Sequence, residues 1–66
     1  MTVREFLEMC TQDYILVDLF DCEGERDLIT INVGDYEDEQ YEDIMEAEMM
    51  SWDIENNRIC INYLIQ

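Results

Sequence analysis

Apolar and polar positions along the chain recur in patterns that predict six short elements. Near the amino terminus, apolar residues fall at the spacing of one helix face, namely Val3, Phe6, Leu7 and Cys10. Thr2 and Glu5 have the spacing of a capping box, in which each side chain binds the backbone amide of the other residue. The sequence therefore predicts a short helix that starts at Thr2 and packs through this apolar face.

Two runs in the first half of the chain favour β-strands. Residues 14–20, YILVDLF, are almost continuously apolar, which is typical of a central strand with both faces at least partly covered. Residues 28–33, LITINV, alternate more cleanly, so we expect one face of this strand in water. Gly24 lies in the polar segment between the two runs and permits a turn, which predicts an antiparallel hairpin.

The most specific local pattern lies at the carboxyl end, in residues 50–65, MSWDIENNRICINYLI. A two-residue turn at Asn56 and Asn57 sets matching residues opposite one another on two strands. The expected pairs are Glu55 with Arg58, Ile54 with Ile59, Asp53 with Cys60, Trp52 with Ile61 and Met50 with Tyr63. Trp52, Tyr63 and Phe6 then fall in phase with apolar faces, so we expect all three to be core residues.

An acidic segment, DYEDEQYEDIMEAE, occupies residues 35–48 between the two hairpins and holds eight carboxylates without a Lys or Arg. Tyr41, Ile44 and Met45 form a narrow apolar stripe, and Asp35 is an acceptable N-cap, so a short helix is expected. Along that helix the like charges repel at i, i+4, in the pairs Asp38/Glu42, Glu39/Asp43 and Glu42/Glu46. This repulsion destabilises the folded segment. Binding to a positively charged partner is therefore the favoured explanation for so many acidic residues.

Together these elements predict one acidic α+β domain over residues 1–66. The expected order is α-β-β-α-β-β, with an antiparallel four-stranded sheet and two short helices. A chain of 66 residues has a marginal core and little room to wall a catalytic cleft. Its hydrophobic content of 48% is nevertheless too high for a disordered acidic tail.

The net charge bears on function, because it indicates the kind of partner that the protein can bind. Eighteen acidic and three basic residues give a formal charge of −15. A magnitude of roughly 2 to 8 is enough to keep a small domain soluble. The excess favours steering toward a positively charged surface, and it argues against binding to anionic membranes or directly to nucleic acid. Leu16 and Leu64 lie outside the main apolar faces, which leaves two alternatives open, a second buried face or a homodimer.

The sequence has few of the residues that catalysis or cofactor binding requires. The chain has no His and no Lys, and Cys10, Cys22 and Cys60 show no metal-binding spacing, so we expect buried thiols, no cofactor and no enzyme. Five acidic residues match a calcium-loop template, namely Asp35, Glu37, Glu39, Asp43 and Glu46. Gln40 stands where that template needs Gly, so no dedicated metal site is expected. Without a signal peptide or an apolar span, the expected location is the cytoplasm.

Two segments carry a resemblance to known proteins. TVREFLEMC, residues 2–10, and DIENNRICINYLI, residues 53–65, resemble short proteins carried by phages and mobile elements of Gram-positive bacteria. The small size and acidity are also similar to phage-encoded DNA mimics, including anti-CRISPR proteins that block the nucleic-acid channel or PAM-reading site of Cas nucleases. The resemblance implies an inhibitor in the host bacterial cytoplasm with a Cas nuclease such as Cas9 as partner. It transfers no individual site residue.

The charge pattern and the resemblance lead to one functional expectation. The protein is expected to occupy the basic nucleic-acid-binding site of another protein by DNA mimicry. The alternatives are an antitoxin-like or regulatory protein-interaction module and a carboxylate-based divalent-cation binder. The expected partner-binding residues are the acidic residues of two segments, namely Glu23, Glu25, Asp35, Glu37, Asp38, Glu39, Glu42, Asp43, Glu46 and Glu48.

Overall fold

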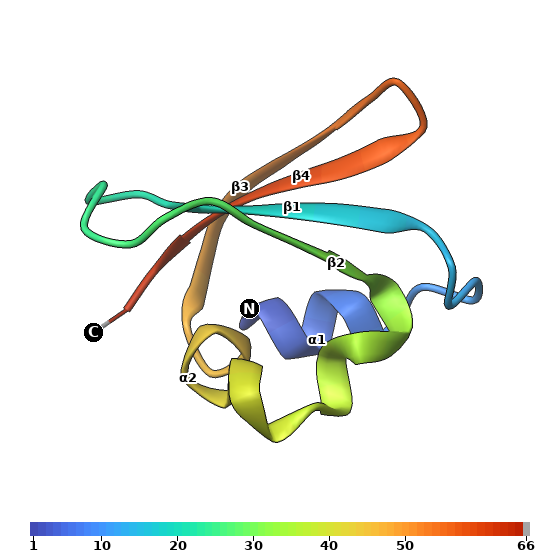
Figure 1. Ribbon diagram of the computed structural model, residues 1–66, viewed down its shortest axis with the longest axis horizontal. Coiled ribbons are helices and arrows are strands. Elements are labelled where there is room, and N and C mark those ends of the chain that lie inside the picture. Colours follow the sequence, from blue (N-terminus) through green and yellow to red (C-terminus); the bar gives the residue numbers. More distant parts are fainter. Residues whose placement is uncertain (66) are drawn as a thin grey trace.

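A four-stranded sheet with short helices on one face makes up the computed structural model, which describes residues 1–65 (Figure 1). In chain order the elements are α1 (Val3–Glu8), β1 (Leu16–Asp21), β2 (Ile29–Asn32), the 3₁₀ turns η1 (Val33–Glu37) and η2 (Glu39–Tyr41), α2 (Glu42–Met45), β3 (Glu48–Glu55) and β4 (Arg58–Leu64). This confirms the prediction of a small α+β domain with four strands and two short helices. It adds two 3₁₀ turns to the predicted order.

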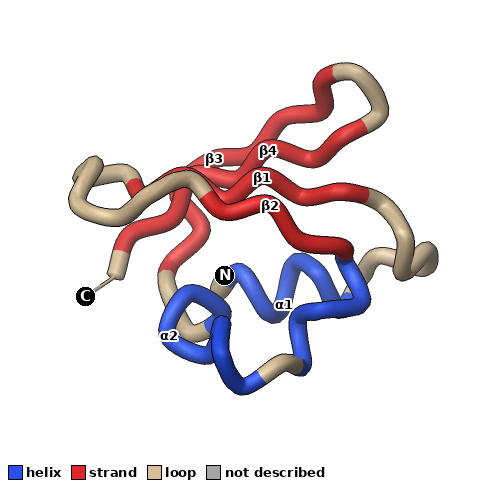
Figure 2. Tube along the Cα trace, in the orientation of Figure 1, coloured by secondary structure: helices blue, strands red, loops and turns tan. Residues whose placement is uncertain are grey.

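The sheet is mixed, so the prediction of a wholly antiparallel sheet was wrong. The strand order is β2-β1-β4-β3, and the two hairpins, β1–β2 and β3–β4, are antiparallel as expected. They join through β1 and β4, which run parallel. The segment from η1 to α2 carries the chain beneath the sheet from β2 at one edge to β3 at the other (Figure 2). A crossover of this length is what allows the parallel pairing.

Helix α1 begins as the sequence predicts. The Glu5 amide donates to Thr2 Oγ1 at 3.1 Å, and the Thr2 amide donates to Glu5 Oε1 at 2.8 Å, which completes the capping box. These hydrogen bonds hold the pKa of the Glu5 carboxyl below its ordinary value. Val3 and Leu7 are buried beneath the sheet, and Phe6 packs at the margin of the core.

The register of the β3–β4 hairpin is confirmed near its turn. The four predicted pairs from Glu55/Arg58 to Trp52/Ile61 are all present. Asn56 and Asn57 have φ of 54° and 62°, the left-handed conformation that a two-residue type I′ turn requires. The predicted pair of Met50 with Tyr63 is wrong, because an irregularity between Met49 and Ser51 shifts the register and sets Met49 opposite Tyr63.

The acidic segment does not form the single helix predicted for it. Asp38 has an extended conformation, with φ −70° and ψ 126°, and separates η1 from η2. Asp35 lies inside η1, where its carboxylate accepts a hydrogen bond from the Asn32 amide at 2.9 Å. Short acidic side chains here bind backbone amides locally and so replace helical hydrogen bonds. The carboxylates therefore do not follow one continuous helix, and α2 keeps the expected pair Glu42/Glu46 at helical spacing, with the Glu46 amide donating to the Glu42 carbonyl at 3.0 Å.

The core lies between the sheet and the helical layer. It joins inward residues of the three strands β1, β2 and β4 to residues of α1 and of the segment from η1 to Ala47. Tyr63 is fully buried as predicted, and among the described residues its hydroxyl has no hydrogen-bond partner. Trp52 is not a core residue, since half of it is exposed and its ring contacts Phe6 with centroids 5.1 Å apart. It lies on β3, the edge strand, where the cover given by the helical layer ends.

Candidate interaction surface

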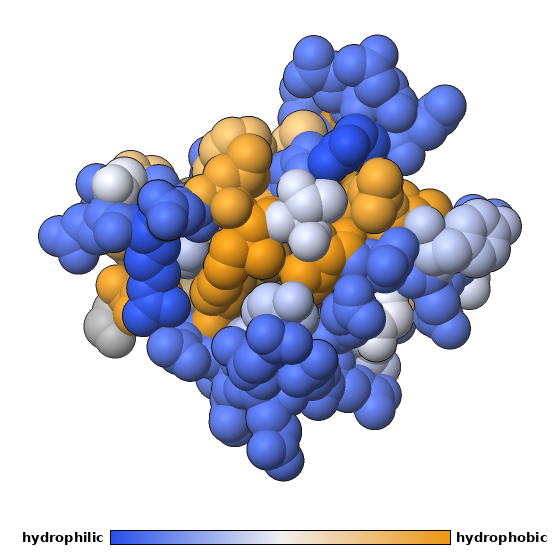
Figure 3. Space-filling model, viewed as in Figure 1, coloured by the Kyte–Doolittle hydropathy of each residue, from blue (hydrophilic) through white to orange (hydrophobic). Residues whose placement is uncertain are grey.

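The carboxylates of residues 35–48, here called the acidic layer, lie on the helical side of the molecule. Most are exposed, whereas Asp35 and Glu48 are half-buried. Hydrophilic side chains cover this side in the space-filling view, and apolar side chains show across the middle of the same view (Figure 3). The structure therefore places most of these carboxylates in solvent, and their role in partner binding stays a prediction. The structure shows that members of the acidic layer have three different local roles.

Three carboxylates of the acidic layer are neutralised by cations from other parts of the chain. Arg4 of α1 binds Glu46 at 2.5 Å, and Arg26 of the β1–β2 loop binds Asp43 at 3.2 Å. The amino group of Met1 lies 3.6 Å from Glu48. The sequence places these cations far from the acidic segment, but folding brings them onto it. These three acids are partly satisfied within the molecule and are weaker candidates for partner binding than predicted.

Two further carboxylates are used by the fold itself. Asp35 accepts the hydrogen bond from Asn32 that closes η1. Asp38 accepts from the side-chain amide of Gln40 at 3.0 Å and from its backbone amide at 3.1 Å, which holds the pKa of Asp38 below its ordinary value. Both residues shape the backbone of the acidic layer. Replacing either one would alter local structure as well as charge.

The remaining three carboxylates, Glu37, Glu39 and Glu42, are exposed and form no ion pair among residues 1–65. Tyr36 is half-buried beside them, and a hydrogen bond with Glu37 raises the pKa of Tyr36. These three glutamates come from η1, η2 and the start of α2. They are the part of the acidic layer whose charge no cation within residues 1–65 neutralises.

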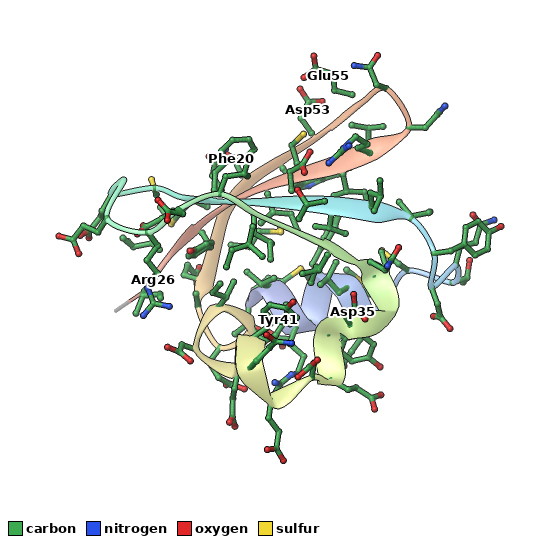
Figure 4. The ribbon with its side chains drawn as sticks, viewed as in Figure 1. Phe20, Arg26, Asp35, Tyr41, Asp53 and Glu55 are labelled. Carbon is green, nitrogen blue, oxygen red and sulfur yellow. The ribbon has the colours of Figure 1, made fainter. Side chains whose placement is uncertain are left out.

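Glu23 and Glu25 lie at the exposed tip of the β1–β2 loop. Asp21 orders this loop, because its carboxylate accepts hydrogen bonds from the amides of Glu23, Glu25 and Arg26 at 3.0 to 3.2 Å. Gly24 has φ +71°, which supplies the turn expected there. Arg26 extends from the loop toward α2 and ties the loop to the acidic layer (Figure 4).

The sheet face away from the helices carries the third arginine. Arg58 donates to Asp18 through Nε at 3.0 Å and Nη2 at 2.5 Å, and the Thr30 hydroxyl donates to the same carboxylate at 2.6 Å. These hydrogen bonds, first that of Arg58, hold the pKa of Asp18 below its ordinary value. The predicted strand pair of Glu55 with Arg58 is present, but within residues 1–65 no ion pair joins these two side chains. The neighbouring strand β1 supplies the acid instead, because the sheet places β4 beside β1.

An apolar surface near the free end of the β3–β4 hairpin was not predicted as a site. Trp52 is 50% exposed and Ile54 is 62% exposed. Beside Ile54 an open hollow of about 710 Å³ lies between the hairpin end and residues 12–16. Its apolar lining comes from Tyr14, Ile15, Leu16, Ile54 and Ile59. No local sequence signal could locate it, because it depends on where the hairpin lies relative to the loop after α1.

Other chemistry is sparse in the described part of the chain. No group of three His, Cys, Asp or Glu residues among positions 1–65 is arranged to hold a metal ion. Cys10 and Cys60 are half-buried, and burial raises the pKa of both thiols, which lowers their reactivity. Cys22 is exposed, so the prediction that all three thiols are buried was wrong. No helix within these residues is long and apolar enough to cross a membrane.

Comparison with known proteins adds no relative: no family model, curated protein or solved structure matches this chain.

Proposed function

We propose that the protein is a non-enzymatic inhibitor that occupies the basic nucleic-acid-binding site of another protein, with a Cas nuclease such as Cas9 as the first target to test. One observation carries the proposal. Within residues 1–65 all three arginines are engaged in ion pairs with the chain's own carboxylates, while the chain keeps a net charge of −15. A partner therefore meets a surface with acids in excess and its cations already neutralised.

The geometry supports the acidic layer as the contacting surface. Glu37, Glu39 and Glu42 are exposed and form no ion pair with any other residue from 1 to 65, so a basic partner could bind them without breaking an ion pair in this part of the chain. Long-range attraction by the whole charge would accelerate association, and contacts at these carboxylates would orient the bound protein. Proteins that bind nucleic acid line their sites with Lys and Arg, which gives the matching charge.

The test is competition between this protein and DNA for a Cas9–guide RNA complex. The readout is binding of a labelled duplex that carries the PAM. We expect the protein to displace the duplex at low salt and to lose affinity steeply as salt rises, because screening weakens contacts between exposed charges. Undiminished duplex binding at saturating protein would exclude this target.

A triple variant tests the acidic layer directly. Neutralising Glu37, Glu39 and Glu42 to Gln should weaken inhibition about tenfold, if each exposed contact contributes about 0.5 kcal/mol. The matched control neutralises three exposed acids outside the layer, Glu8→Gln, Asp13→Asn and Asp27→Asn, and leaves the same net charge. Equal inhibition by the two variants would show that the acidic layer is not the contacting surface.

A further inference from the structure

The edge strand β3 has a backbone edge that its own chain covers only in part. At its start, Thr2 forms an antiparallel bridge with Glu48, the Met49 amide donates to the Met1 carbonyl at 2.9 Å, and the Val3 amide donates to the Ala47 carbonyl at 3.1 Å. The chain thus already adds a short extended segment to this edge. Beyond Met49, residues 50–55 lie at the edge of the four-stranded sheet (Figure 1).

The two faces of this free edge differ in chemistry. Trp52 and Ile54 lie opposite the buried residues Ile61 and Ile59 of β4, so they share the inward face, yet both remain at least half exposed. Asp53 and Glu55 lie on the opposite face and extend away from the helical layer (Figure 4). Side chains therefore alternate between apolar and acidic along the edge.

We propose that residues 50–55 of β3 bind an extended segment of a basic protein in which apolar and basic residues alternate, so that the segment becomes a fifth strand. Backbone hydrogen bonds would hold the segment, its apolar side chains would cover Trp52 and Ile54, and its Lys or Arg side chains would meet Asp53 and Glu55. The proposal rests on the proposed function in taking the partner to be basic. It adds a second contact surface, distinct from the acidic layer.

The charge of the β3 edge favours binding of a basic segment over pairing with a second copy of the chain. Pairing of two β3 edges would bring Asp53 and Glu55 of each copy close to the same acids of the other, and each copy carries a net charge of −15. Like charges on neighbouring strands are destabilising, and charged residues on an edge strand commonly prevent self-pairing. The same two acids that exclude a second copy attract a basic strand.

The hollow beside the hairpin extends the apolar side of this surface. Ile54 belongs both to the free edge and to the lining of the hollow, which also includes Tyr14, Ile15 and Ile59. An apolar side chain of the added strand next to Ile54 therefore lies at the mouth of the hollow. A bulky side chain at that position of the segment would bury more apolar area than one further along the strand.

The test uses synthetic peptides and the full chain. The probe is a peptide of alternating Lys and Val, long enough to pair with residues 50–55. Its matched control has the same composition with the Lys residues in one block. Binding is followed by the fluorescence of Trp52, the single Trp of the chain, and by amide exchange at residues 50–55. We expect the alternating peptide to bind at least tenfold more tightly and to slow exchange at these amides.

Two further arms separate strand pairing from simple charge attraction. Methylating the peptide amides that face β3 should abolish binding, because it removes backbone donors but keeps every charge. In the protein, Asp53→Asn with Glu55→Gln should weaken binding about tenfold. Glu8→Gln with Asp27→Asn removes the same charge from two exposed positions outside both proposed surfaces and should weaken binding much less. Equal affinity of the two peptides, or binding that survives methylation, would overturn the strand proposal while leaving the proposed function standing. Sedimentation as a dimer with residues 50–55 protected would also overturn it.

Discussion

At the scale of single residues, Asp18 shows how the fold uses its few cations. Its side chain is 13% exposed and accepts hydrogen bonds from Arg58 and Thr30 on the two neighbouring strands. Since β1 lies between β2 and β4, this one carboxylate links three strands across the face of the sheet that the helices leave uncovered. Arg58 is 38% exposed, so solvent screens part of the attraction and the pair is worth less than a fully buried one.

Replacing Asp18 by Asn should lower the free energy of unfolding by about 1 kcal/mol at neutral pH. Because the pKa of Asp18 is lowered in the folded state, its stabilisation is fully present above the ordinary carboxyl value of about 4. It is lost as the pH falls from there through the lowered folded value. The two proteins should therefore converge in stability at low pH. Urea unfolding at several pH values measures this, with Asp27→Asn as an exposed control.

At the scale of elements, sequence patterns correctly predicted the features that depend on neighbouring residues alone. The turn at Asn56 and Asn57 and the pairs next to it were predicted correctly, because turn type and side-chain alternation fix the register there. The irregularity at Met50 was not predictable from the hairpin pattern, since at its start β3 pairs with β4 and also forms a bridge from Glu48 to Thr2 of the distant amino-terminal segment. The acidic segment was read as one helix because its apolar stripe was in phase. The carboxylates of Asp35 and Asp38 instead accept hydrogen bonds from the backbone amides of Asn32 and Gln40, which divides the segment into shorter turns.

The turn offers a matched pair of substitutions at Asn57. Its φ of 62° is readily adopted by Gly and strained for Ala. Asn57→Gly should raise the free energy of unfolding by about 0.5 kcal/mol, whereas Asn57→Ala should lower it by about 1 kcal/mol. Chemical denaturation of the two variants and the parent protein measures both changes. If the two substitutions had equal effects, the left-handed conformation at this position would be contradicted.

At the scale of the whole molecule, composition predicted the charge but not its arrangement. The sequence identified the acidic segment as the main carboxylate surface, yet it could not show that Arg4 and Arg26 fold onto that segment. It also missed the parallel contact of β1 with β4, because strand order depends on how distant segments pack rather than on local periodicity. The free edge of β3 follows from that order, so it too was beyond the reach of sequence patterns.

Added salt should stabilise this protein. A net charge of −15 on a chain of 66 residues repels itself in the folded state, and ions screen that repulsion. Between low and moderate NaCl concentration we expect the Tm to rise by about 5 °C, which corresponds to roughly 1 kcal/mol for a domain of this size. Circular dichroism melting curves measure it. The variant with Glu37, Glu39 and Glu42 neutralised should show a smaller rise, and a falling Tm would mean that the ion pairs outweigh the repulsion.

The position of β4 also determines when a nascent chain can complete its fold. In the sheet this strand lies between β1 and β3, although it is the last of the four strands to be made. Until it leaves the ribosome, the inward side chains of the first hairpin, such as Val17 and Leu19, lack their neighbours Ile59 and Ile61. A nascent chain therefore passes through a stage in which its apolar residues are open to chaperones and proteases. The sheet can therefore form completely only after β4 has been translated.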